Sequence, residues 1–304
     1  MKKLGTYGLV LLFVACLGCA TNASGGFVAH RNIAYATIPG VDANLLSLDI
    51  YTPANATAKP APVVVWVHGG GWAIGDKANG MQTKPDLLTG AGYCLVSINY
   101  RLSPDQESAD PKRIMYPVHE QDVASALAWV HSHAGEYGAD PDRIALMGHS
   151  AGAHLVSIIS TDESFLKEHG LPLTIIKGTI SLDTAGDDIP SAMERDPRHI
   201  FRNAFGTDPA IWKKASPLYH ISADKGIPPF LLVTRGMPDR RDRTTEFALA
   251  LQKIRVKATV VDATGYSHSE VNRKLGEAGE AVVTQPVMKF LAGCLQPSPE
   301  AAKK

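Results

Sequence analysis

The chain has 304 residues, of which 45% are hydrophobic and 20% charged, so it is long enough to bury a large core. Its 30 lysines and arginines balance 30 aspartates and glutamates, which excludes the basic footprint of a nucleic-acid-binding protein. The sequence has no internal repeat, no H-E-x-x-H, and no C-x-x-C pair beyond its N-terminal segment, so we expect no metal and no cofactor.

Residues 1–23 predict a bacterial-type signal peptide, cleaved near residues 19–23. Two lysines precede an apolar run that is too short for an ordinary membrane span, and small residues follow it. A lipid anchor at Cys19 is the alternative, although Cys16 stands where a lipobox prefers leucine. We therefore expect a periplasmic or secreted product, or a membrane-anchored lipoprotein, in which residues 24–304 form a single domain without a transmembrane span.

A buried strand followed by a glycine run begins the candidate site. Residues 62–67, P-V-V-V-W-V, read as a parallel strand, and H-G-G-G-W follows at once. Consecutive glycines let backbone N–H groups point at one spot. The amides of Gly70 and Gly71, with that of Ala151, are therefore the expected oxyanion-hole donors. Trp72 adjoins this loop and is the candidate substrate-binding residue.

A serine between two glycines follows the next predicted strand. G-H-S-A-G occupies residues 148–152, after an apolar run at 143–147 and at the start of a helix-compatible run at 151–160. In G-x-S-x-G the serine sits on a strained turn between strand and helix, with its hydroxyl exposed. A helix N-terminus there also favours developing negative charge. We interpret Ser150 as a nucleophile; a flexible Gly-Ser turn is the alternative.

The order serine, acid, histidine predicts the general base. His268 follows the strand at residues 257–261, and a loop beyond the carboxyl end of a strand is where open α/β sheets place their ligands. We therefore assign His268 as the base. His68 is predicted to brace the glycine loop, and His154 to pack in the core.

The predicted acid follows the preceding strand. Residues 229–234 read as a buried strand, and Asp239 comes five residues after its end. A carboxylate in this place would hold the histidine tautomer and stabilise the imidazolium. Asp242 is a competing candidate, and Asp262 is a weaker one.

Strands and helices alternate along the chain, which predicts a mostly parallel sheet with helices on both faces. The clearest helices are expected at residues 121–133, 151–160, 244–254 and 284–291. Residues 184–222 are the least regular segment, and we interpret them either as a partial lid or as a region whose aromatic residues simply pack. Cys94 and Cys294 are expected to be two buried thiols, with a disulfide between them as the alternative in an oxidising compartment.

These residues together resemble the esterase branch of the α/β-hydrolase superfamily. More narrowly, the chain is similar to H-G-G-G-W carboxylesterases near the feruloyl-esterase-like and kynurenine-formamidase-like bacterial enzymes. The resemblance covers nearly all of residues 24–304 and includes L-S-L-D-I-Y-T-P at residues 46–53. His149 stands where hormone-sensitive-lipase-like enzymes usually carry Asp, which argues against that subfamily. The resemblance implies an α/β-hydrolase fold with a small cap or none.

We therefore expect a serine hydrolase that cleaves short to medium acyl or aryl esters through an acyl-enzyme. Its expected partner is a small-molecule ester, not a nucleic acid. One alternative is an amidase of the kynurenine-formamidase type with the same triad, which the predicted export disfavours. The other is a non-catalytic binding protein on the same scaffold, which the presence of a candidate for every triad role disfavours.

Overall fold

The computed structural model describes residues 22–24, 26–55, 59–195 and 199–296. The predicted signal peptide, including the candidate lipid anchor Cys19, lies almost wholly outside these ranges and stays a prediction. Within these ranges, no helix has both the length and the apolar character needed to cross a membrane. Cys94 and Cys294 are free thiols, the first buried and the second half-buried.

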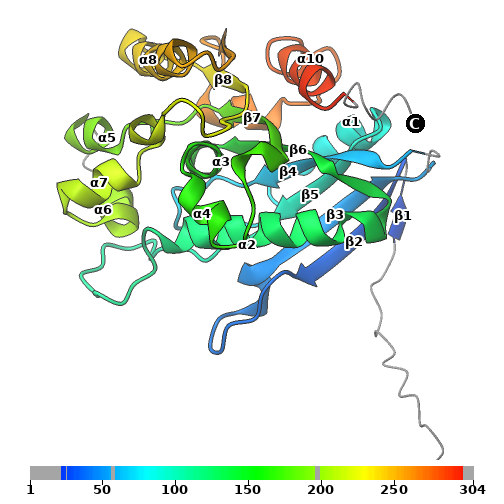
Figure 1. The fold of residues 1–304 in the computed structure, drawn as a ribbon, viewed down its shortest axis with the longest axis horizontal. Coiled ribbons are helices and arrows are strands. Elements are labelled where there is room, and N and C mark those ends of the chain that lie inside the picture. The colour runs from blue at the N-terminus through cyan, green and yellow to red at the C-terminus, as the bar shows by residue number, and fades with distance from the viewer. Residues whose placement is uncertain (1–21, 25, 56–58, 196–198, 297–304) are drawn as a thin grey trace, which may run out of the picture.

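One sheet organises the described part of the chain (Figure 1). Its nine strands are β1 (Asn22–Ser24), β2 (Phe27–Ala34), β3 (Ser47–Pro53), β4 (Ala61–Val67), β5 (Cys94–Ile98), β6 (Ala139–His149), β7 (Ile176–Leu182), β8 (Phe230–Thr234) and β9 (Ala258–Asp262). Their order across the sheet is β1-β2-β3-β5-β4-β6-β7-β8-β9. All pairs from β5 to β9 are parallel, and the pairs from β1 to β5 are antiparallel. The prediction of a mostly parallel sheet is therefore confirmed.

Ten α-helices accompany this sheet in the described ranges. They are α1 (Lys84–Gly90), α2 (Val118–His133), α3 (Ala151–Thr161), α4 (Glu163–Lys167), α5 (Ile189–Arg195), α6 (His199–Phe205), α7 (Pro209–Lys214), α8 (Pro238–Lys253), α9 (His268–Arg273) and α10 (Thr284–Cys294). All four predicted helices are present, and α8 begins six residues earlier than expected. Proline at the start of α8 explains this, because its fixed φ suits the first turn of a helix.

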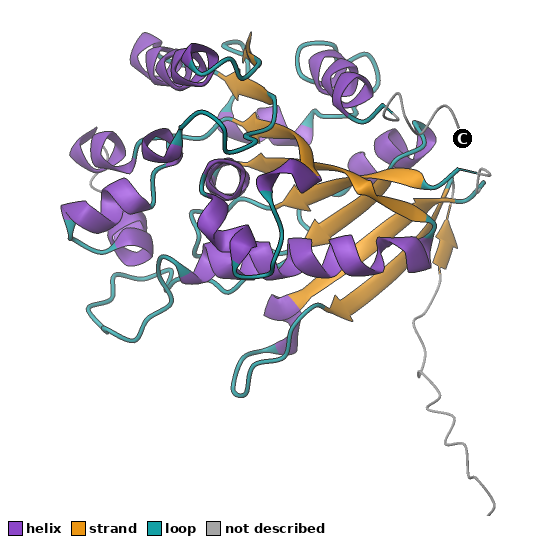
Figure 2. Ribbon diagram, in the orientation of Figure 1, coloured by secondary structure: helices purple, strands orange, loops and turns teal. Residues whose placement is uncertain are grey.

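Helices cover both faces of the sheet, as Figure 2 shows. Alternate residues of β4 lie in two separate cores: Val65 belongs to the core that includes side chains of α2, α3 and α8, and Trp66 to the core that includes side chains of α1, α9 and α10. Continuous apolar character in a strand therefore reflects burial on both sides. This arrangement leaves the loops at the carboxyl ends of the parallel strands free to carry the site.

The segment 184–222 is more helical than predicted. It contains α5, α6 and α7, which lie together at one end of the molecule (Figure 1). Helices of six or seven residues are too short to show a clear period, and they depend on tertiary packing. Phe201 and Phe205 of α6 are buried against Trp72, so these aromatic residues pack in the core. Ile200, however, lies beside Gly71, so α6 borders the glycine loop.

Candidate active site

Ser150 stands on a strained turn between β6 and α3. Its φ is +58°, a conformation that non-glycine residues rarely adopt. A Cβ on Gly148 would lie 2.3 Å from the Gly152 carbonyl oxygen, and one on Gly152 would lie 2.1 Å from the Val67 carbonyl oxygen. Only glycine therefore fits on either side of the serine. The strand, turn and helix expected from G-H-S-A-G are all present.

The glycine loop after β4 takes a conformation that only glycine accepts easily. Gly70 has φ +117°, and a Cβ there would lie 1.9 Å from the Ile74 carbonyl oxygen. The amides of Ala73 and Ile74 both donate to the Gly70 carbonyl, which closes the turn. Outside the helices and strands of the described residues, the amides of Gly70, Gly71 and Ala151 donate to no backbone carbonyl. These three amides stay the predicted oxyanion donors.

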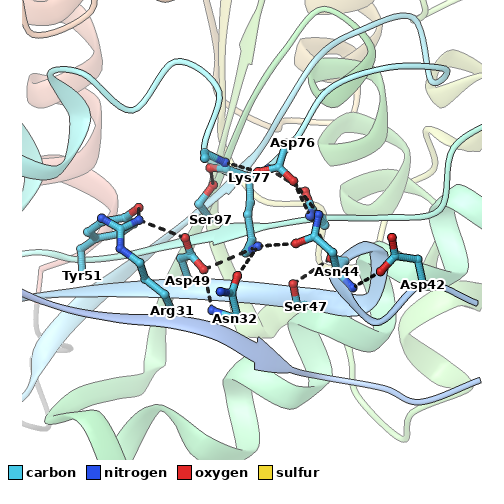
Figure 3. Close-up of polar contacts among 12 residues, drawn as sticks. Arg31, Asn32, Asp42, Asn44, Ser47, Asp49, Tyr51, Asp76, Lys77 and Ser97 are labelled. Carbon is cyan, nitrogen blue, oxygen red and sulfur yellow. Dashed lines mark hydrogen bonds and ion pairs between the residues drawn. The ribbon is translucent and has the colours of Figure 1, made fainter. Parts of the chain in front are cut away.

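A buried lysine anchors the far end of this loop (Figure 3). The Lys77 ammonium donates to Asn32 Oδ1 at 2.9 Å and Asn44 Oδ1 at 2.8 Å, and lies 3.7 Å from Asp49 Oδ1. The backbone amide of Lys77 donates to the Asn99 side chain at 2.6 Å. Polar side chains from β2, from β3, from the connection between them and from the end of β5 thus hold the residues that follow the glycines.

We expect Lys77→Met to lower both stability and kcat. Loss of the ammonium group leaves the Asp49 carboxylate and the side-chain oxygens of Asn32 and Asn44 with one partner fewer each. Breaking a buried ion pair by removing one partner costs about 3–5 kcal/mol of unfolding free energy. A displaced glycine loop would also reduce kcat by about tenfold or more, because this loop carries two of the predicted oxyanion donors. Thermal unfolding and kcat measured together test this. Lys253→Met on the exposed end of α8 is the control and should change neither.

His268 is paired with a carboxylate that the sequence analysis did not single out. Its Nδ1 lies 2.5 Å from Oδ2 of Asp183, which directly follows β7. His268 is the first residue of α9, whose start is set by a capping box between Ser267 and Glu270. Because β7, β8 and β9 are neighbours, loops at their carboxyl ends meet above the same edge of the sheet.

Two arginines hold the Asp183 carboxylate. Arg235 Nε donates to Oδ2 at 2.6 Å and Arg240 Nε donates to Oδ1 at 2.8 Å, while the Asp183 side chain is fully buried. Burial alone would raise the pKa of Asp183, but the hydrogen bond from His268 and the two guanidinium groups outweigh it and lower this pKa to about 2. The ionised carboxylate can only accept, so His268 carries a hydrogen on Nδ1, and in the neutral form of the ring Nε2 is the acceptor.

The structure contradicts the prediction that Asp239 is the partner of His268. Asp239 lies in the first turn of α8, is half-exposed, and pairs with Arg195 at 3.1 Å and Arg243 at 3.6 Å. The helix starts at Pro238 and turns this carboxylate away from the sheet. Of the weaker candidates, Asp262 pairs with Arg241 on the surface. The sequence feature that could have identified Asp183 is its position directly after β7, the strand that neighbours the nucleophile strand β6.

The Trp72 side chain is buried in the core, which contradicts its prediction as a substrate-binding residue. The side chain is only 3% exposed, and its ring packs against Phe201 and Phe205. Its Nε1 donates to His154 Nδ1 at 3.2 Å, while His154 Nε2 binds the Ala215 carbonyl oxygen at 2.8 Å. Burial of a large apolar ring with a satisfied N–H explains this position. The prediction that His154 packs in the core is confirmed.

His68 braces the glycine loop, as predicted. It is buried, its Nδ1 lies 2.7 Å from the Gly69 carbonyl oxygen, and its ring stacks on Tyr100 at 4.5 Å. Burial lowers the pKa of His68, so the ring stays neutral. A neutral ring so far inside the loop is suited to support rather than to proton transfer.

A cavity of 270 Å³ lies against the glycine loop. Its lining includes Gly69, Gly70 and His149, together with Asn272 of α9. A larger cavity of 640 Å³ lies between β8, β9 and α10, and none of the predicted site residues lines it. Of these two cavities, the smaller one therefore borders the glycine loop, although neither Ser150 nor His268 is among its lining residues. No cluster of side chains suited to hold a metal ion occurs among the residues that the structure describes.

Comparison with known proteins finds a matching family model and relatives that are named as esterases. A family model described as BD-FAE matches residues 48–244. The chain is 30% identical over 244 residues to a probable isoprenylcysteine alpha-carbonyl methylesterase of Arabidopsis thaliana, covering 74% of this chain and 48% of the relative. It is 31% identical over 205 residues to esterase LipQ of Mycobacterium tuberculosis, covering 64% and 46%. The chain thus spans about half the length of these curated relatives.

Solved structures share the fold at low identity. Esterase B from Lactobacillus rhamnosis aligns with a TM-score of 0.71 and 19% identity, covering 93% of this chain and 91% of the other. A truncated form of a carbohydrate esterase from gut microbiota aligns with a TM-score of 0.70 and 18% identity, covering 94% and 100%. The likeness covers the sheet and the helices on both of its faces, and at this identity it shows the fold alone.

Proposed function

Since the chain belongs to the BD-FAE family and has the α/β-hydrolase fold, we propose that it is a serine hydrolase of carboxylic esters. The observation that carries the proposal is the His268–Asp183 hydrogen bond of 2.5 Å next to the strained turn of Ser150. Nucleophile, base and acid are then Ser150, His268 and Asp183. The names of curated relatives, which are esterases, support the same class of reaction.

The proposed reaction has two halves. His268 Nε2 takes the hydroxyl proton of Ser150 as its oxygen attacks the acyl carbon, and the amides of Gly70, Gly71 and Ala151 stabilise the oxyanion. The tetrahedral intermediate collapses, the ester C–O bond breaks, and His268 returns the proton to the leaving alcohol. Water then attacks the acyl-enzyme with the same base, which releases the acid and restores Ser150. Asp183 stays ionised and stabilises the imidazolium throughout.

We propose short to medium acyl or aryl esters as substrates. The cavity of 270 Å³ beside the glycine loop is smaller than the roughly 300–1,000 Å³ typical of sites for drug-sized ligands. Ile200 of α6 borders the loop next to Gly71, which further limits the space there. These features favour small acyl or alcohol groups over long chains.

A panel of 4-nitrophenyl esters graded in acyl length tests this function. We expect the purified protein to hydrolyse the short members fastest and to react once per chain with a fluorophosphonate, which needs an activated serine. Matched anilides should be cleaved much more slowly. A folded protein that neither hydrolyses any ester nor takes up the fluorophosphonate would rule the proposal out.

A further inference from the structure

His149, the residue before the candidate nucleophile, lies between the base and the glycine loop. It is the last residue of β6 and is 7% exposed. Its ring centroid lies 4.5 Å from that of His268, with the two planes at 36°. A Cβ placed on Gly69 would come within 3.2 Å of His149 Nδ1. The His149 side chain therefore contacts His268 and the glycine loop, and His149 directly precedes Ser150 in the chain.

A hydrogen bond ties His149 to the backbone of the base residue. His149 Nε2 lies 2.9 Å from the carbonyl oxygen of His268. Because a carbonyl oxygen only accepts, Nε2 must carry the hydrogen and Nδ1 must be bare. Burial, followed by the nearby His268, lowers the pKa of His149 to about 3. The ring therefore stays neutral and can lie against a charged imidazolium without repelling it.

The hydrogen bond from His149 matters for His268 because Asp183 holds only one atom of the His268 ring, Nδ1. The bond to Asp183 Oδ2 orients Nδ1 of His268, but the place of Nε2 also depends on the backbone from which the ring projects. That backbone begins a helix of six residues and follows the exposed residues Thr264 and Gly265. β6 is central in the sheet, so a side chain from its end offers a rigid anchor.

We propose that His149 is a positioning residue for the ester hydrolysis proposed above. Its Nε2–H holds the His268 carbonyl, so the base keeps its place relative to Ser150 while Asp183 holds Nδ1. The inference rests on the proposed function. A misplacement of the base of about 1 Å is enough to lower kcat by about 100-fold without weakening substrate binding.

Three substitutions separate the donor from the ring. His149→Leu removes both, His149→Phe keeps an aromatic ring without the N–H, and His149→Gln keeps an N–H donor without the ring. We expect the Leu and Phe variants to lose about 100-fold in kcat at unchanged KM, and the Gln variant to recover to within about tenfold of the wild type. Wild-type kcat in the Leu and Phe variants would overturn the inference, as would a folded Gln variant no faster than Leu.

A second measurement does not depend on activity or on the folding of a variant. In the wild-type protein labelled with ¹⁵N-histidine, we expect His149 to show the Nε2–H tautomer and no titration between about pH 5 and 8, where an unperturbed histidine would titrate. An Nδ1–H tautomer, or protonation in that range, would overturn the inference.

Wild type and Ser150→Ala are assayed on the same esters: equal rates for these two would refute the proposed function, whereas equal rates for wild type and His149→Leu would refute only the role of His149.

Discussion

Ser150→Ala should lower kcat for a short-chain aryl ester by about a million-fold, which leaves only the weak turnover that binding and the oxyanion donors provide. The side-chain oxygen is the atom that would bond to the acyl carbon, and no other hydroxyl can replace it from the same strained turn. Alanine adds no bulk and keeps the Cβ that the turn already holds. Initial rates on 4-nitrophenyl acetate and labelling by a fluorophosphonate measure the loss.

Ser157→Ala is the matched control for this variant. Ser157 lies in the same helix, α3, and its Oγ is buried without a hydrogen-bond partner among the described residues. Its removal leaves no polar group unpaired, so stability and kcat should stay near the wild-type values. Comparable kcat in Ser150→Ala and wild type would show that Ser150 is not the nucleophile.

Asp183→Asn should lower kcat by about 10⁴-fold, and Asp239→Asn should leave it near the wild-type value. An amide in place of the Asp183 carboxylate cannot stabilise the imidazolium, and it can impose the wrong tautomer on His268. It also leaves Arg235 and Arg240 without their anionic partner, so a lower Tm is expected as well. Asp239 is half-exposed, and its surface ion pairs contribute little.

The measurement is kcat for both variants at a temperature where circular dichroism shows each to be folded. This condition separates a lost catalytic role from a lost fold. A folded Asp183→Asn protein with wild-type kcat would contradict the role of Asp183. A large loss of kcat in Asp239→Asn but not in Asp183→Asn would instead identify Asp239, the acid predicted from the sequence, as the partner of His268.

Local patterns predicted the parts of the molecule that depend on neighbouring residues. The apolar run at residues 62–67 predicted β4 because a strand buried on both faces has no polar alternation. G-H-S-A-G predicted the turn of Ser150 because its glycines are required by backbone contacts of 2.1 to 2.3 Å. His268 could be found in the same way, since it follows a strand and lies within the capping box of Ser267 and Glu270.

Contacts between distant segments could not be predicted in this way. Asp183 and Asp239 both follow a parallel strand and both lie between Ser150 and His268 in the chain, and Asp239 was predicted because it follows the strand directly before that of His268. Only the helix that starts at Pro238 decides that Asp239 faces outward while Asp183 meets His268. Trp72 adjoins the glycine loop, which favoured a pocket wall, but the packing of α6 against it places it in the core.

By itself, therefore, the sequence determined the parallel sheet, the strained turn of Ser150, the glycine loop and the position of His268. Short-range steric contacts and strand burial depend on residues that are adjacent in the chain, so local patterns reveal them. Only the tertiary structure decided which carboxylate pairs with His268, where Trp72 lies, and that His149 joins the nucleophile strand to the base. The physical reason is distance along the chain: the His268–Asp183 pair spans 85 positions and the His149–His268 bond spans 119. Such pairs form only when the loops at the carboxyl ends of the strands are brought together.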